Sequence, residues 1–156
     1  GVSPAAYEGS VTQLYSVIIY VSLAQCVGIA LLSGVLVGVL YGAAYAPAAN
    51  VILVLVWYTA FSYLGAVRDI WLLGENKQRL LWKINLCGVI CNIVLNLLLI
   101  PLWGILGAAA ASLTTQLFTN VLLGFVFRDI RRNNTLMARA LNPGQMRLRS
   151  LFSKGR

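Results

Sequence analysis

Polar side chains recur at helical spacing inside otherwise apolar segments of this sequence. In one segment, Tyr58, Ser62 and Asp69 fall on one helical face, and Arg68 lies at its edge. Two later segments repeat this pattern with one lysine and several amides: Lys83, Asn85, Asn92, Asn96, Gln116 and Asn120. In a membrane, such residues face the interior of a helix bundle or a water-filled cavity. The spacing therefore predicts either the lining of a hydrophilic path or hydrogen bonds between packed helices.

The sequence lacks the groups that catalysis or metal binding requires. It contains no His, and no Ser, Thr or Cys has an available base near it. No two carboxylates share a predicted face. Cys26, Cys87 and Cys91 lie inside apolar segments without the spacing of a zinc site or a disulfide framework. We expect no enzymatic activity, no cofactor and no metal.

The composition indicates a membrane protein. The chain has 156 residues, of which 60% are hydrophobic and 10% charged, against about 25% charged residues in an ordinary soluble domain. Crossing a bilayer takes about 20 apolar residues. Four segments are long enough, and we expect an all-α bundle with spans at 14–40, 48–73, 80–100 and 104–127.

The basic residues indicate the topology. The net charge is +8, but its residues lie mainly outside the spans, so a nucleic-acid partner is not expected. Lys77 and Arg79 occupy the second connection, whereas the first and third carry no Lys or Arg. By the positive-inside rule, the segment 1–13 and the basic tail 128–156 are both cytoplasmic. The tail either lies on anionic lipid headgroups or is partly disordered, and Pro143-Gly144 breaks any long helix within it.

Two local patterns describe how the spans pack. The sequence from Pro101 to Gly104 predicts a short turn that makes the third and fourth spans antiparallel. Gly34 and Gly38 form a GxxxG pattern, which favours close contact between helices.

The segments Leu40–Ala48 and Asn92–Ala109 resemble the C-terminal part of polysaccharide flippases of the O-antigen type. The second segment reads N-x-x-L-N-x-x-L-I-P-x-x-G-I-x-G-A-A. The resemblance extends from Ser3 to Asn133 and leaves out the end of the basic tail. These flippases belong to the same superfamily as the multidrug and toxin extrusion transporters.

The resemblance implies a transporter with two lobes of six helices, to which this chain contributes four spans of the C-terminal lobe. Such a protein moves undecaprenyl-pyrophosphate-linked oligosaccharide across the bacterial inner membrane by alternating access, for polysaccharide biosynthesis. Its implied partners are this substrate, membrane lipids and the rest of the transporter. The chain's start without Met fits a processed N-terminus or a piece of a longer protein. Arg68 and Lys83, near the predicted cytoplasmic mouth, are candidates for contact with the pyrophosphate.

Two other functions remain open from the sequence. One is the export of drugs or of lipid II by a member of the same superfamily. The other is a small four-helix membrane scaffold that oligomerises through its glycine-containing faces.

Overall fold

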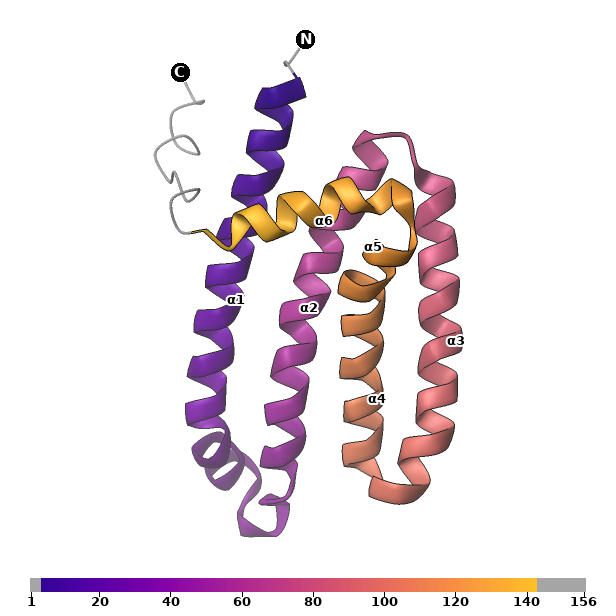
Figure 1. The fold of residues 1–156 in the computed structure, drawn as a ribbon. Coiled ribbons are helices and arrows are strands. Elements are labelled where there is room, and N and C mark those ends of the chain that lie inside the picture. Colours follow the sequence, from indigo (N-terminus) through magenta and orange to yellow (C-terminus); the bar gives the residue numbers. More distant parts are fainter. Residues whose placement is uncertain (1–3, 143–156) are drawn as a thin grey trace.

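The computed structural model describes residues 4–142, which form a bundle of helices (Figure 1). The elements in chain order are α1 (Pro4–Tyr41), a 3₁₀ turn η1 (Ala43–Tyr45), α2 (Ala48–Gly74), α3 (Gln78–Trp103), α4 (Ile105–Leu117), a π-helical turn η2 (Phe118–Leu122), α5 (Leu123–Val126) and α6 (Arg128–Ala140). The expected all-α fold class is confirmed.

Four helical segments are long and apolar enough to cross a membrane, as expected of a membrane protein. They are Ala6–Tyr41, Ala48–Gly74, Gln78–Trp103 and Ile105–Val126. The shortest has 22 residues, which at 1.5 Å per residue is about 33 Å and matches a hydrocarbon core of about 30 Å. Large apolar side chains such as Leu31, Val39 and Leu97 are more than 70% exposed, which suits a surface that faces lipid.

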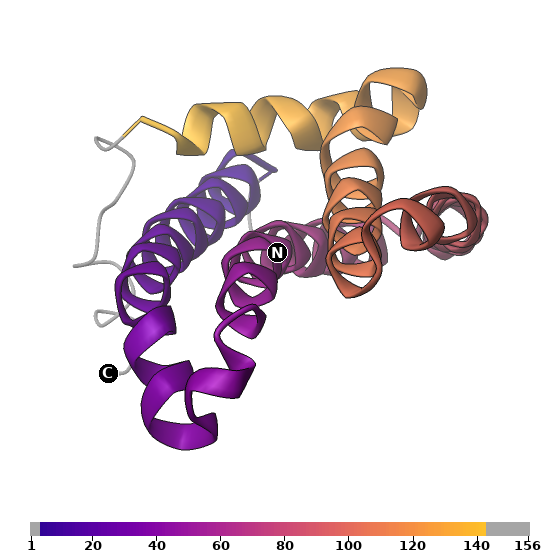
Figure 2. The same cartoon turned by 90° about the horizontal axis from the view of Figure 1, so that it is seen from below.

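The helices form a row in the order α1, α2, α4, α3 (Figures 1 and 2). Neighbours in this row contact each other extensively, whereas α2 and α3 touch mainly near their short connection. The largest group of buried apolar residues lies near that connection, where Tyr15, Trp71, Leu72 and Ile84 are almost inaccessible. Away from it, α4 lies between α2 and α3 (Figure 1).

Helix α1 begins earlier than the predicted span. The predicted span starts at residue 14 and leaves residues 1–13 outside it, but the helix starts at Pro4. Proline is compatible with a first helical turn because the amide it lacks would have no helical partner there. The added turns are more polar than the rest of α1 and extend it to 38 residues, which is about 57 Å and longer than a bilayer core.

The predicted turn at 101–104 is shorter in the structure. Helix α3 continues through Pro101 to Trp103, and Gly104 alone separates α3 from α4. Gly104 has a φ of +57°, which disfavours a residue with a side chain. At Gly107, a Cβ atom would lie 2.1 Å from the backbone oxygen of Leu99. The two glycines therefore allow an antiparallel hairpin with very close backbones.

The predicted basic tail begins with a helix that packs against the bundle. Helix α6 crosses the bundle near one end and contacts α1 (Figures 1 and 2). The Tyr15 hydroxyl donates to Asn133 Oδ1 at 3.0 Å, and the Ser16 hydroxyl donates to the Ala140 carbonyl at 2.9 Å. Residues 128–140 of the predicted tail are therefore helical and packed against α1, while the choice between a lipid-bound and a partly disordered tail stays a prediction. The predicted break at Pro143-Gly144 and the basic residues beyond it lie outside the described residues.

Helix α6 is strongly amphipathic. Its buried face includes Ile130 and Leu136, while Arg128, Arg132 and Arg139 lie on the exposed face. Arg132 also pairs with Glu8 of α1, and this carboxylate raises the pKa of the Arg132 guanidinium by accepting its hydrogen bond. A basic amphipathic helix of this kind is suited to the membrane interface.

Candidate functional site

A polar cavity lies between α2, α3 and α4 and has a volume of about 600 Å³. Helix α4 with the π-helical turn forms its floor, and α2 and α3 form its sides. Eight of the ten residues proposed from the sequence line it, and these are Tyr58, Ser62, Arg68, Asp69, Asn85, Asn92, Gln116 and Asn120. The structure thus brings together polar faces that the sequence shows only as separate helical stripes.

The other two proposed residues lie elsewhere. Asn96 lines a smaller pocket of about 320 Å³ near Pro101. Its side-chain amide donates to the Asn92 carbonyl oxygen and to Asn92 Oδ1, both at 2.9 Å, so it holds the Asn92 side chain from one helical turn away. Lys83 is exposed on α3 and does not line the polar cavity.

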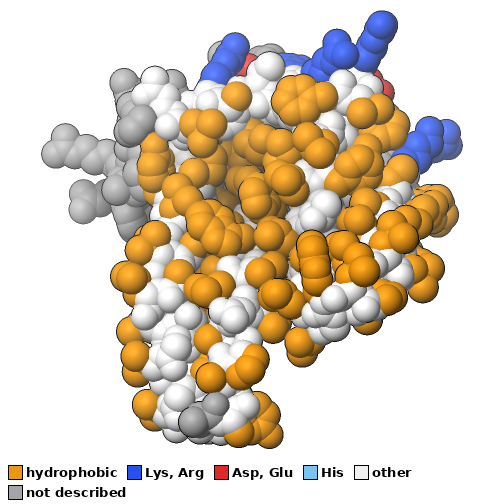
Figure 3. Space-filling model, turned by 60° about the horizontal axis from the view of Figure 1, so that its bottom comes forward, with side chains coloured by type: hydrophobic (Ala, Val, Ile, Leu, Met, Phe, Trp, Pro, Cys, Tyr) orange, Lys and Arg blue, Asp and Glu red, His pale blue; other side chains and the backbone are white. Residues whose placement is uncertain are grey.

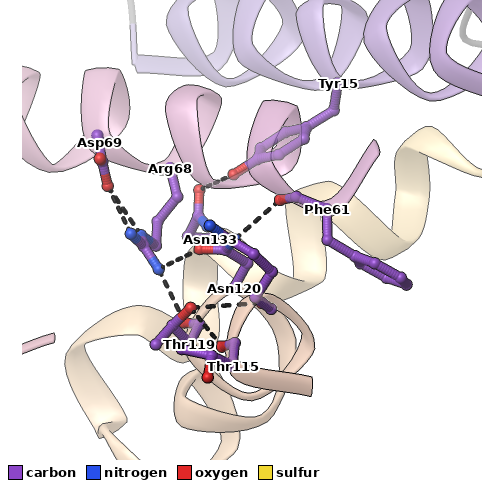
Figure 4. A network of polar contacts seen from close by, with 9 residues as sticks. Tyr15, Phe61, Arg68, Asp69, Thr115, Thr119, Asn120 and Asn133 are labelled. Atoms are coloured by element: carbon purple, nitrogen blue, oxygen red, sulfur yellow. Dashed lines mark hydrogen bonds and ion pairs between the residues drawn. The ribbon is translucent and has the colours of Figure 1, made fainter. Parts of the chain in front are cut away.

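Arg68 is at the centre of the most extensive polar network in the described part of the chain (Figure 4). The residue is only 4% exposed. Its guanidinium donates to Asp69 Oδ1 from Nε at 3.0 Å and from Nη2 at 2.7 Å, and from Nη1 to the Thr119 carbonyl and to Asn120 Oδ1, both at 2.8 Å. The ion pair and the hydrogen bonds compensate the cost of burying this charge.

The Asn120 side chain links Arg68 to two helices. Its Oδ1 accepts from Arg68, while its Nδ2 donates to the Phe61 carbonyl at 2.8 Å and to Gln116 Oε1 at 2.5 Å (Figure 4). The approach is possible because residue 65 is glycine, where a Cβ atom would lie 2.6 Å from Asn120 Oδ1. Asn120 therefore fixes α2 against the end of α4.

The π-helical turn provides a backbone acceptor for this network. The Leu123 amide, which in a regular α-helix would reach Thr119, donates to the Phe118 carbonyl instead. The Arg68 guanidinium donates to the Thr119 carbonyl. Irregular turns of this type inside long helices frequently occur at functional sites.

The contact between α3 and α4 includes two residues that were not among the predicted site residues, Thr115 and Thr119. The Asn92 side-chain amide donates to the Thr115 hydroxyl at 3.3 Å, and that hydroxyl donates to the Ala111 carbonyl at 2.8 Å. Thr119 packs against Gly88, where a Cβ atom would lie 2.8 Å from its methyl group. Thr115 and Thr119 are four apart, which is a signal in the sequence, but threonine is common enough in apolar helices that the spacing alone did not distinguish them.

The cavity is polar without a large net charge. Its charged residues are Arg68 and Asp69, which pair with each other, and the other polar groups are hydroxyls and amides. Among the described residues there is no group of three or more His, Cys, Asp or Glu side chains that could hold a metal ion. Asn85 is exposed, and Tyr58 and Ser62 are partly exposed. Such a site can offer hydrogen bonds to hydroxyl groups from several sides.

Comparison of this chain with protein-family models, with curated proteins and with solved structures found no match.

Proposed function

We propose that this chain forms one wall of a transport path for lipid-linked oligosaccharide, as part of a flippase in the bacterial inner membrane. The single observation that carries the proposal is the polar cavity between three membrane-length helices. A polar surface inside an apolar bundle is costly unless its groups are satisfied or wetted, so intramembrane polar sites generally mark substrate paths.

The chemistry of the lining favours a sugar over an ion or an apolar drug. Amides and hydroxyls can both donate and accept hydrogen bonds, and sugar hydroxyls require both. Tyr58 adds an aromatic ring on the same face of α2. An inorganic ion would require an unpaired charge or a set of ligands, whereas Arg68 and Asp69 already neutralise each other.

The discontinuity in the last span supports a transport role. Helix α4 passes through the π-helical turn into α5 next to the network around Arg68. Transporters commonly form substrate sites from interrupted membrane helices. We propose that the remaining wall of the path comes from the rest of the transporter, and that the lipid tail stays in the bilayer while the glycan crosses the polar cavity.

This proposal changes the role of two candidates. The charge of Arg68 is committed to Asp69 and to the end of α4, so we assign it to holding the shape of the cavity. Lys83 lies outside the cavity and remains a candidate only for an early contact with the pyrophosphate.

The test uses Tyr58→Leu and Asn85→Leu, produced from the native gene in a strain that lacks it. Both residues line the cavity, and neither side chain forms a hydrogen bond with another described residue. Surface glycan is measured on cells with matched protein levels. We expect it to fall about two- to tenfold for each variant, as for the loss of one hydrogen bond.

Two matched controls separate the path from general effects of added leucine. Tyr63 lies on α2 and Asn50 at its start, both are exposed, and neither lines the cavity. Tyr63→Leu and Asn50→Leu should leave surface glycan unchanged. Equal losses in all four variants, or no loss in any, would remove the cavity from the transport path.

A further inference from the structure

A second cavity lies on the opposite side of α2, between α1, α2, α5 and α6, and has a volume of about 570 Å³. Its lining is almost entirely apolar and includes Leu23, Trp57, Phe61 and Phe125. Figure 3 shows a hollow with hydrophobic side chains on this face of the molecule, with Lys and Arg side chains gathered at the end beyond it. We call it the apolar cavity.

The two cavities use opposite faces of the same helix. On α2, Trp57 and Phe61 face the apolar cavity, whereas Tyr58 and Ser62 line the polar one. The apolar cavity is therefore separate from the proposed glycan path, and an occupant of one does not fill the other.

Three polar residues of helix α6 contribute to the lining of the apolar cavity. Arg131, Asn134 and Thr135 are spaced at i, i+3 and i+4, so they share one face of α6 and line the cavity together. Further along the same helix the lining becomes apolar, with Met137 and Ala138. The cavity thus combines a large apolar surface with a few polar residues from α6, as the binding of an amphiphile requires.

Arg131 has capacity for an anion. Its guanidinium donates a long hydrogen bond of 3.4 Å to the Phe125 carbonyl. Arg131 takes part in neither of the two ion pairs between described residues, which are Arg68 with Asp69 and Arg132 with Glu8. It therefore retains donors for a phosphate group.

Asn134 fixes the position of α6 beside the cavity. It is 8% exposed and its Nδ2 donates to the Val121 carbonyl at 3.1 Å. Its Oδ1 is buried and has no hydrogen-bond partner among the described residues. That oxygen lies against Gly124, where a Cβ atom would be 2.3 Å from it, so contact with a charged headgroup falls to Arg131.

We propose that the apolar cavity binds one anionic phospholipid. An acyl chain occupies the space beside Trp57 and Phe61, and the phosphate pairs with Arg131. The volume lies in the range of about 300–1,000 Å³ typical of ligand sites. The basic residues on the exposed face of α6 attract the same lipids to this helix.

The test is native mass spectrometry of the whole purified protein from micelles containing phosphatidylglycerol and phosphatidylcholine in equal amounts. We expect retention of one phosphatidylglycerol, with a preference of about fivefold over phosphatidylcholine, as for one basic residue near a lipid phosphate. Arg131→Gln should remove this preference and Arg131→Lys should keep most of it. Ala138→Phe, which adds bulk at the cavity, should lower retention of both lipids.

Arg139→Gln is the matched control, because Arg139 is an exposed basic residue of α6 that does not line the cavity. It should retain the preference of the unaltered protein. Equal retention of the two lipids, or an equal loss in Arg139→Gln and Arg131→Gln, overturns the proposal in favour of surface charge alone. Displacement of phosphatidylglycerol by undecaprenyl phosphate also overturns it, and would assign the cavity to the substrate's tail.

Discussion

At the scale of single residues, the buried charge of Arg68 determines how the polar cavity is built. The sequence places Arg68 at the edge of a polar face, and the structure shows that it pairs with Asp69. Its contacts with Thr119 and Asn120 join residues more than 50 positions apart. Periodicity within a helix cannot reveal such partners, because they depend on which helices are neighbours.

The variant Gly65→Ala tests this network by adding one methyl group beside the Asn120 side chain. The added Cβ must displace Asn120, whose side chain is held by bonds to Arg68, Phe61 and Gln116. Overpacking of this kind costs about 1–3 kcal/mol. The free energy of unfolding, measured by SDS titration in mixed micelles, should fall by that amount.

Gly34→Ala provides the control for the change in helix propensity. Nothing lies within 4 Å of a Cβ at Gly34 or Gly38, so the GxxxG pattern makes no close contact with the described residues. Without a clash, the alanine should leave stability unchanged or raise it by about 0.5–1 kcal/mol. If the free energy of unfolding falls equally in the two variants, the close fit of Gly65 to Asn120 does not account for the loss of stability.

At the scale of elements, the sequence predicts the existence of the spans better than their interruptions. Hydropathy locates the four apolar segments, but it contains no signal for the π-helical turn at 118–122, which depends on the packing around Thr119 and Asn120. Proline at 101 indicates a helix end, yet α3 continues for two more residues because only the turn that precedes the proline loses a hydrogen bond. In residues 128–140 the mixture of basic and apolar residues indicates an amphipathic segment, but it does not show that the apolar face packs against α1.

The docking of α6 on α1 can be tested with Tyr15→Phe. This change removes the donor to Asn133, which is 1% exposed, and leaves a buried acceptor unsatisfied. The loss of this hydrogen bond costs about 1–1.5 kcal/mol, so α6 should detach about five- to tenfold more often. Trypsin cleavage at Arg132 and Arg139, followed by mass spectrometry, measures this exposure.

The matched control for this experiment is Tyr63→Phe, which alters an exposed tyrosine on α2. It should leave the cleavage rate at α6 unchanged. Equal cleavage of the two variants and the unaltered protein would mean that the Tyr15 hydroxyl does not secure α6.

At the scale of the whole molecule, the order α1, α2, α4, α3 produces two cavities of opposite polarity on either side of α2. The sequence predicts the polar stripes, because alternation of polar and apolar residues along a helix is local information. It does not predict that α4 separates α2 from α3, because the order of the helices depends on packing across the bundle. The apolar cavity is missed for the same reason, because its lining comes from distant parts of the chain.

The most direct measurement of the central claim is photocrosslinking to radiolabelled lipid-linked oligosaccharide. A photoreactive benzoylphenylalanine replaces Asn85 on the polar cavity or, in the control, Tyr63 on the outer surface of α2. If the cavity carries the glycan, label should attach at position 85, compete with unlabelled substrate, and be absent at position 63. Equal labelling at the two positions, or labelling at 63 alone, would contradict the account.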